Sequence, residues 1–180
     1  DLARKAGPRL PLRFVAFAGE EPPHFSTRDM GSWHHARAAR ERGEKIAGML
    51  SLEMLGYYDA RPGSQGYPPL LSRFYPPAGD FLALVSNLKS RGFLKRLALG
   101  LRAAGCPALE TASLPGWVPG VSLSDQLNFW EHGYPAAMLT DTAMYRNPHY
   151  HRPSDTPETL NYGRIASWVS ALAQALAAWE

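Results

Sequence analysis

The stretch that decides the fold reads Leu12-Arg13-Phe14-Val15-Ala16-Phe17-Ala18-Gly19-Glu20-Glu21. Its first seven residues are mostly apolar and lie between Pro11 and Gly19, which predicts a buried strand within a sheet. Two adjacent glutamates then follow the glycine directly. Side chains of neighbouring residues in extended backbone point to opposite sides, so one carboxylate can bind a metal while the other faces a bound water. The stretch therefore suggests a metal-dependent hydrolase.

Composition narrows the class of protein. The chain has 180 residues, of which 45% are hydrophobic, and this predicts one domain over residues 1–180. Its formal net charge is +3 and the basic residues are dispersed, so we expect no nucleic-acid partner. Cys106 is the only cysteine, which excludes an intrachain disulfide and a cysteine-rich zinc site. No stretch approaches the roughly 20 apolar residues of a membrane-spanning segment.

Segments with the apolar pattern of strands alternate along the chain with segments that have the pattern of helices. Strands alternating with helices predict an α/β fold, a three-layer αβα sandwich with a mostly parallel or mixed central sheet. Residues 61–77 are dense in Pro, Gly and Tyr and are interpreted as an insertion or a loop that walls a pocket. Besides the strand at 12–18, we expect strands at 46–54, 108–111 and 135–140, and helices at 28–42, 80–90, 93–104, from Ser124, and from a capping Asn161 onward.

A second acid lies at the end of a predicted strand, in Ser51-Leu52-Glu53-Met54. A buried acid at Glu53 needs an ion-pair partner or a metal, and taken alone the ion pair is the commoner explanation. The segment from Asn147 to Glu158 changes that balance because it carries His149 and His151. Imidazole nitrogens and carboxylate oxygens are zinc ligands, and catalytic zinc sites keep one position for water.

Four elements together resemble the zinc aminopeptidase family called M28. They are Gly19-Glu20-Glu21, the strand end at Ser51–Met54, Ser124-Asp125 before a short helix, and Tyr150-His151 followed after three residues by Asp155-Thr156. They occur in the order of the family, and the resemblance covers essentially the whole chain. It implies the zinc-peptidase sandwich of the phosphorylase/hydrolase-like type.

The resemblance also implies roles for individual residues. Glu20 would be the general base that takes a proton from metal-bound water, and Tyr150 would hydrogen-bond the oxyanion of the tetrahedral intermediate. Glu21 and His151 would ligate one zinc ion, and Glu53 would ligate a second. We prefer His151 to the neighbouring His149 as the ligand, because the family pattern places the ligand directly after a tyrosine.

Two further acids match the family pattern without a ligand role. Asp155 would orient the ligand region or line the pocket rather than bind metal. Asp125 would lie beside the ligands or in the pocket, or would be an acid in the first turn of its helix with no part in catalysis.

The same resemblance requires a histidine and a bridging aspartate upstream of Glu20. Asp1 is the only acid among the preceding nineteen residues, and no histidine occurs there. We therefore expect the first part of the domain, with the strands before Leu12, to lie outside these residues. The two-zinc site would be complete only in a longer parent polypeptide, and this chain alone is expected to hold part of it.

The function implied for the parent is hydrolysis of peptides with a free N-terminus, and the aromatic content suggests a hydrophobic first residue. Two alternatives stay open, a glutaminyl cyclase-like acyltransferase and a non-catalytic scaffold with the peptidase fold. The resemblance favours a secreted, periplasmic or membrane-anchored parent.

Overall fold

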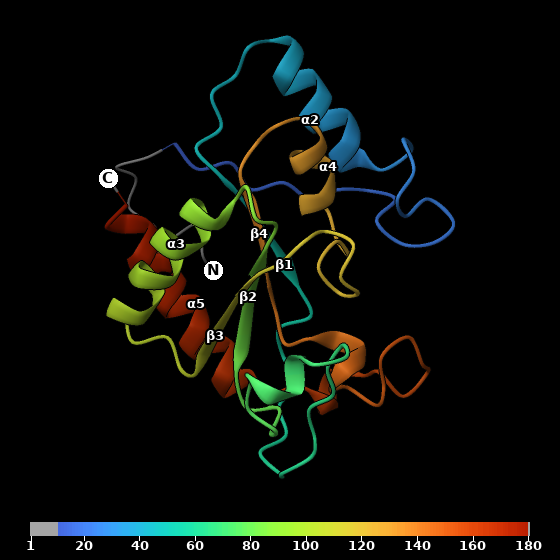
Figure 1. Ribbon diagram of the computed structural model, residues 1–180, viewed down its shortest axis with the longest axis vertical. Coiled ribbons are helices and arrows are strands. Elements are labelled where there is room, and N and C mark those ends of the chain that lie inside the picture. The colour runs from blue at the N-terminus through green and yellow to red at the C-terminus, as the bar shows by residue number, and fades with distance from the viewer. Residues whose placement is uncertain (1–10, 180) are drawn as a thin grey trace.

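A four-stranded mixed sheet forms the centre of the protein, whose computed structural model describes residues 11–179 (Figure 1). The strand order is β1-β4-β2-β3, so β1 and β3 are the edges. β1 runs parallel to β4, β2 runs parallel to β3, and β2 and β4 are antiparallel. The strands are β1 (Met49–Glu53), β2 (Leu82–Ser86), β3 (Leu109–Ser113) and β4 (Ala136–Thr140).

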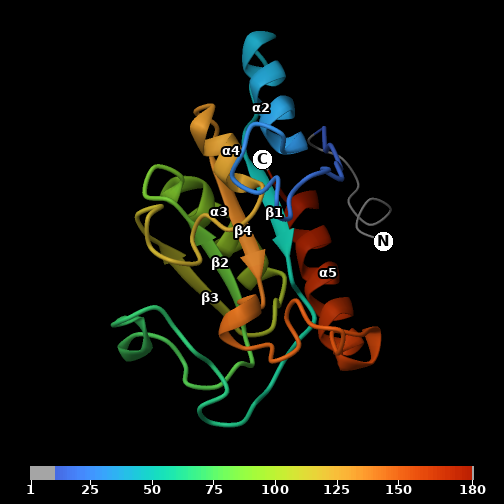
Figure 2. The same ribbon diagram turned by 90° about the vertical axis from the view of Figure 1, so that its right-hand side faces the viewer.

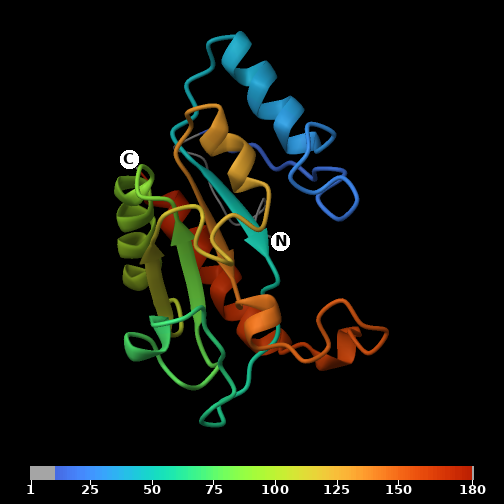
Figure 3. The same cartoon turned by 45° about the vertical axis from the view of Figure 1, so that its right-hand side comes forward.

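Helices cover both faces of this sheet. α3 (Arg91–Ala103) and α5 (Tyr162–Ala177) pack against one face and against each other. α2 (Gly31–Glu41) and α4 (Gln126–Glu131) lie across the sheet from them (Figure 3), where they pack together near β1 and β4. The predicted α/β sandwich with a mixed sheet is confirmed.

The main core lies between the sheet and the pair α3 and α5. Alternate strand residues, including Leu84 and Leu139, are fully buried and contact Leu101 and Leu172 from the two helices. Burial of each such side chain contributes about 1.5–3 kcal/mol. A smaller cluster beneath α2 and α4 contains Ala36, Ala39, Phe129, Tyr134 and Ala136.

The predicted strand at 12–18 is wrong. These residues pair with no strand in the described chain, and Leu12, Phe14 and Val15 are 36%, 54% and 43% exposed. Phe17 is the exception, because it packs against the small cluster beneath α2. Apolar composition indicates burial only where a second surface is present to cover the segment, and within residues 11–179 no strand supplies one.

The predicted helix at 80–90 is also wrong, because this segment contains β2. Leu82, Ala83 and Leu84 are all buried, since the strand lies between β4 and β3 in the middle of the sheet. A short continuous apolar run does not distinguish a buried strand from a helix. The helices predicted at 28–42 and 93–104 form as α2 and α3, with boundaries within three residues of those expected.

Two long connections gather at one end of the sheet, residues 57–80 and residues 141–161 (Figure 2). They contain short 3-10 helices at Leu71–Arg73, Ala143–Tyr145 and Pro157–Thr159. Asn161 caps α5 as predicted, with its side-chain oxygen accepting a hydrogen bond from the Arg164 N–H. Within residues 11–179 no helix is both long and apolar enough to cross a membrane.

Candidate functional site

The carboxyl end of β1 and two loops bring the candidate residues together. Glu53 is the last residue of β1. The loop that carries Glu20 and Glu21 turns at Gly19, whose φ of +72° is a conformation that favours glycine. The Gly31 N–H donates a 2.8 Å hydrogen bond to the Ala18 carbonyl, which closes this loop at the start of α2.

Glu21 and His151 meet although 130 positions separate them in the sequence. The His151 Nε2 lies 3.4 Å from a carboxylate oxygen of Glu21, and both side chains are more than half exposed. Tyr150 stacks on the His151 ring with the ring centroids 3.9 Å apart. One imidazole and one carboxylate therefore face the same solvent-accessible position, with a phenol beside them.

Glu20 and Glu53 lie beside Ser124. The buried Ser124 hydroxyl donates a 3.2 Å hydrogen bond to Glu53 and is 2.9 Å from the Ser51 hydroxyl. Burial and the charge of Glu53 raise the pKa of Glu20 to about 7, and a hydrogen bond to Ser124 opposes this rise. Burial also raises the pKa of Glu53, again opposed by Ser124. Ionisation is therefore disfavoured at both Glu20 and Glu53, and the Ser124 hydroxyl lies next to both carboxyls.

Tyr150 completes this group. Its pKa is raised, first by burial and then by the charges of Glu53, Glu21 and Glu20. The Tyr150 hydroxyl therefore keeps its proton at neutral pH and remains a hydrogen-bond donor.

Asp125 lies next to the site, whereas Asp155 does not. Burial raises the pKa of Asp125 and a hydrogen bond to Ser32 lowers it, while one of its carboxylate oxygens is buried without a partner among the described residues. Asp125 occupies the N-cap position of α4 but makes no side-chain cap bond. The Ser124 hydroxyl, one residue earlier, does not cap the helix either, because it is engaged with Glu53 and Ser51.

The Asp155 side chain is exposed, and residues 11–179 offer its carboxylate no hydrogen bond or ion pair. The structure does not bring it to His151. The alternative ligand His149 points elsewhere, with its Nδ1 3.0 Å from the Ser154 hydroxyl and its ring against Tyr57. Of the two histidines, His151 is the one that contacts Glu21.

The donor chemistry fits part of a zinc site. Glu21 and His151 supply one oxygen and one nitrogen ligand to a shared position, and Glu53 supplies a further carboxylate. Within the described part of the chain, no three His, Cys, Asp or Glu side chains are grouped closely enough to hold a metal ion. A tetrahedral zinc ion between Glu21 and His151 would need two more ligands.

Asp141 is an acid that the sequence reasoning missed. It follows β4 directly and is fully buried. Its carboxylate accepts hydrogen bonds from the N–H groups of Gly56 at 3.0 Å, Tyr57 at 2.8 Å and Ala143 at 3.0 Å. Asp141 thereby fixes the chain just after Glu53 to the end of β4. Its position directly after a strand is the same signal that singled out Glu53.

Comparisons with known proteins identify the family of the chain. The model of the family described as Peptidase family M28 matches residues 1–176. The uncharacterized protein YfbL of Escherichia coli K12 is 43% identical over 166 residues, which is 92% of this chain and 50% of that protein. The chain thus spans about half the length of this curated relative.

Solved structures share the fold at low sequence identity. The Legionella pneumophila LapA aminopeptidase has a TM-score of 0.58 at 19% identity, over 83% of this chain and 36% of that one. The glutaminyl cyclase of Fimbriiglobus ruber has a TM-score of 0.58 at 17% identity, over 83% of this chain and 44% of that one. BSAP, a zinc aminopeptidase of Bacillus subtilis, has a TM-score of 0.54 at 17% identity, over 81% of this chain and 31% of that one.

Proposed function

Because the chain belongs to peptidase family M28, we propose that the protein is an aminopeptidase in which Glu20 serves as the general base. The observation that carries the proposal is the contact between Glu21 and His151, whose ligand atoms lie 3.4 Å apart. Two exposed side chains from distant segments meet there as metal ligands do, beside the partly buried carboxyls of Glu20 and Glu53.

Zinc is the cofactor that this donor set supports. Glu21 and His151 would hold one ion and Glu53 would contribute to a second, with the remaining ligands drawn from outside the described residues. Bound zinc would supply Lewis-acid polarisation of the scissile carbonyl and would make the attacking water more acidic.

Glu20 moves the proton in the proposed reaction. Its carboxylate takes a proton from the attacking water as the new C–O bond forms, and later gives that proton to the leaving amine as the C–N bond breaks. The pKa of Glu20, raised to about 7, is near the value at which a carboxyl both accepts and returns a proton at neutral pH. The Tyr150 hydroxyl donates a hydrogen bond to the oxygen on which negative charge develops.

Replacing Glu20 tests the assignment of the base. In the full-length protein loaded with zinc, Glu20→Gln should lower turnover of aminoacyl-anilides by about 10²- to 10⁴-fold. Zinc content, measured by elemental analysis, should stay unchanged. Glu131→Gln, an exposed change of the same kind on α4, is the matched control. Retained turnover in a zinc-loaded Glu20→Gln protein would refute the role.

The ligand assignment has a test independent of turnover. His151→Ala and Glu21→Ala should each lower the zinc stoichiometry or affinity measured by metal titration, whereas His149→Ala should leave them unchanged. A loss of zinc in His149→Ala with none in His151→Ala would exchange the two histidines.

The same preparations distinguish the two alternative functions. A glutaminyl cyclase would release ammonia from a peptide with N-terminal glutamine without shortening it, and an aminopeptidase would release the free amino acid. A full-length protein that folds but binds no zinc and alters neither substrate would be a scaffold.

A further inference from the structure

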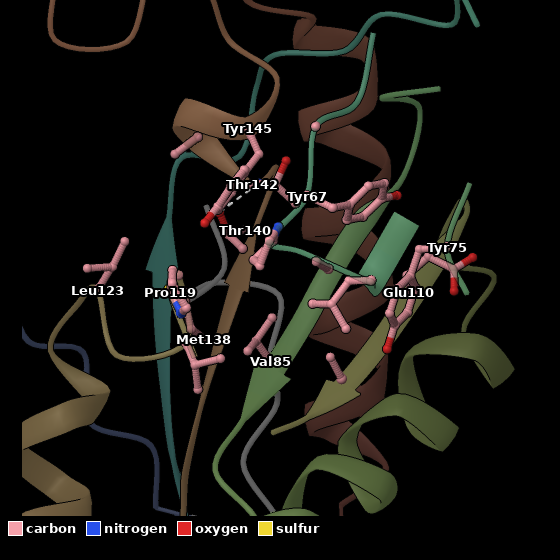
Figure 4. Close-up of a pocket in the computed structure, with 18 of the residues that line it drawn as sticks. Tyr67, Tyr75, Val85, Glu110, Pro119, Leu123, Met138, Thr140, Thr142 and Tyr145 are labelled. Atoms are coloured by element: carbon pink, nitrogen blue, oxygen red, sulfur yellow. Dashed lines mark hydrogen bonds between the residues drawn. The ribbon is translucent and has the colours of Figure 1, made fainter. Parts of the chain in front are cut away.

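An apolar pocket opens on the sheet beside the candidate site. Its volume is about 100 Å³, and both Glu53 and Tyr150 are part of its lining. Strand residues that face away from α3 and α5 form its floor, and Figure 4 shows Val85, Met138 and Thr140 pointing into it. The predicted loop at 61–77 contributes one wall through Tyr67 and Tyr75. The pocket is therefore placed to receive a side chain of a substrate held at Glu53.

One row of paired residues crosses the whole sheet beneath this pocket. Glu53 pairs with Thr140, Thr140 with Ala83, and Ala83 with Glu110. Directly paired residues share a face of the sheet, so all four side chains project on the pocket side. The row begins at the carboxylate of Glu53 on β1 and ends at the carboxylate of Glu110 on the opposite edge strand. Between the two acids the floor is uncharged.

Glu110 is the one acid at the far end of the pocket. Its charge raises the pKa of the two neighbouring phenols, Tyr67 and Tyr75, in addition to the larger effect of their burial. The two tyrosine rings stack with centroids 6.0 Å apart, and Figure 4 shows Tyr75 beside Glu110 at the β3 side of the pocket. Residues 11–179 provide no ion-pair or hydrogen-bond partner for the Glu110 carboxylate. A carboxylate next to aromatic rings favours a cation.

We propose that Glu110 selects substrates whose N-terminal residue is lysine or arginine. This inference rests on the proposed aminopeptidase function and differs from the hydrophobic first residue that the aromatic content suggested. The ammonium or guanidinium group binds between the Glu110 carboxylate and the tyrosine rings. The aliphatic stem of the side chain lies along Val85 and Met138.

The dimensions of the row agree with such a side chain. Three inter-strand spacings put the Cα atoms of Glu53 and Glu110 ~14 Å apart. The bonds from the Cα to the Nζ of an extended lysine span about 6 Å and an ion-pair contact adds about 3 Å, so a substrate Cα that lies about 5 Å along the row from Glu53 brings the ammonium group to Glu110. A leucine or alanine side chain in the same position would leave the Glu110 carboxylate without a partner.

Matched substrates test the selectivity directly. With the full-length zinc-loaded protein we expect kcat/KM for lysine and arginine anilides to exceed that for the methionine anilide, which is unbranched but uncharged. Glu110→Gln should lower kcat/KM for the basic substrates by about 10- to 100-fold. In Glu110→Gln the kcat/KM for the methionine anilide should change less than about twofold. Glu131→Gln should leave kcat/KM unchanged for all three substrates. Equal effects of Glu110→Gln on the lysine and methionine substrates would overturn the proposal.

A binding measurement separates this inference from the proposed function. Titration calorimetry with L-lysinamide and L-methioninamide should show tighter binding of the lysine compound to the wild type and no such preference in Glu110→Gln. If that preference is found but no anilide is cleaved, hydrolysis is refuted and the cation site stands. If anilides are cleaved without any preference for basic residues, the cation site is refuted. Thermal unfolding of Glu110→Gln should match the wild type, because the residue lies on an edge strand.

Discussion

Arg146 fixes the wall of the pocket to the sheet, and its removal gives a prediction that follows closely from the structure. Its side chain is buried. The guanidinium donates a 2.9 Å hydrogen bond to the Gln65 side chain and a 2.8 Å hydrogen bond to the Phe81 carbonyl. Its charge also lowers the pKa of the buried Asp141 carboxyl, against the larger effect of burial. Arg146 thereby connects the loop at 61–77, the start of β2 and the end of β4.

Arg146→Met keeps much of the side-chain volume and removes the charge, these two hydrogen bonds and a longer one of 3.4 Å to the Tyr57 carbonyl. Hydrogen bonds of a charged group contribute about 1.5–3 kcal/mol each, so the gross loss is about 3–6 kcal/mol. The variant no longer bears the cost of burying the guanidinium charge, and this offsets part of the loss. The Asp141 carboxyl, however, loses the nearby positive charge. We expect the free energy of unfolding to fall by about 3 kcal/mol, the lower end of this gross loss.

Urea unfolding at pH 7 followed by circular dichroism measures this change. Arg73→Met is the matched control, because Arg73 lies in the same pocket loop with an exposed side chain. We expect it to change the free energy of unfolding by less than about 0.5 kcal/mol. A loss below about 1 kcal/mol for Arg146→Met would refute the reasoning, because the buried hydrogen bonds would then contribute no more than surface contacts do.

The pH dependence of the same variant isolates the part that belongs to Asp141. Burial raises the pKa of Asp141 to about 6 in the folded protein, against about 3.9 for an unfolded chain. Its contribution to stability is therefore complete below about pH 4 and is lost as the pH rises through 6. Without Arg146 the ionised carboxyl is still less favourable, so the destabilisation by Arg146→Met should be larger at pH 8 than at pH 5. Equal losses at both pH values, or no recovery when Asp141→Asn is added, would exclude this coupling.

Three further changes probe the core, a helix cap and the metal. Leu139→Ala, at a fully buried position in a central strand, should lower the free energy of unfolding by about 2–5 kcal/mol. Leu99→Ala, on the exposed side of α3, should lower it by less than about 0.5 kcal/mol in the same urea titration. Asn161→Ala removes the cap of α5 and should cost about 1 kcal/mol, visible as a lower thermal midpoint; an unchanged midpoint would contradict the cap. Chelation of zinc should lower the thermal midpoint of the full-length protein but leave that of His151→Ala nearly unchanged, and equal shifts in both would contradict the ligand assignment.

Local signals in the sequence were sufficient where the structure depends on neighbours in the chain. The helical spacing at 93–104 predicts α3, and Asn161 is recognisable as a cap because its oxygen reaches an N–H three residues later. Glu53 stands out because an acid directly follows apolar strand residues. Asp141 carries the same signal and was missed, since its partners lie about 85 positions earlier, at Gly56 and Tyr57.

Whether the first apolar stretch is buried depends instead on surfaces that are distant from it in the sequence. Residues 12–18 have the composition of a central strand, yet Phe14 is more than half exposed and only Phe17 reaches a cluster. The meeting of Glu21 with His151 is equally non-local, because the spacing of 130 residues contains no geometric information. Resemblance to a family predicted that pair, whereas periodicity and composition did not.

β2, where the sequence predicted a helix, lies in the row of strands that connects Glu53 with Glu110. If residues 80–90 were a helix, Glu53 and Glu110 would lie on separate elements with no defined relation. As β2, the segment places Ala83 between Thr140 and Glu110 and points it into the pocket. The small alanine side chain leaves the floor open between the two carboxylates. Ala83→Leu should therefore obstruct long substrate side chains while the geometry of Glu21 and His151 is retained, raising KM for lysine anilides with zinc content unchanged. An unchanged KM would show that the substrate side chain does not cross this row.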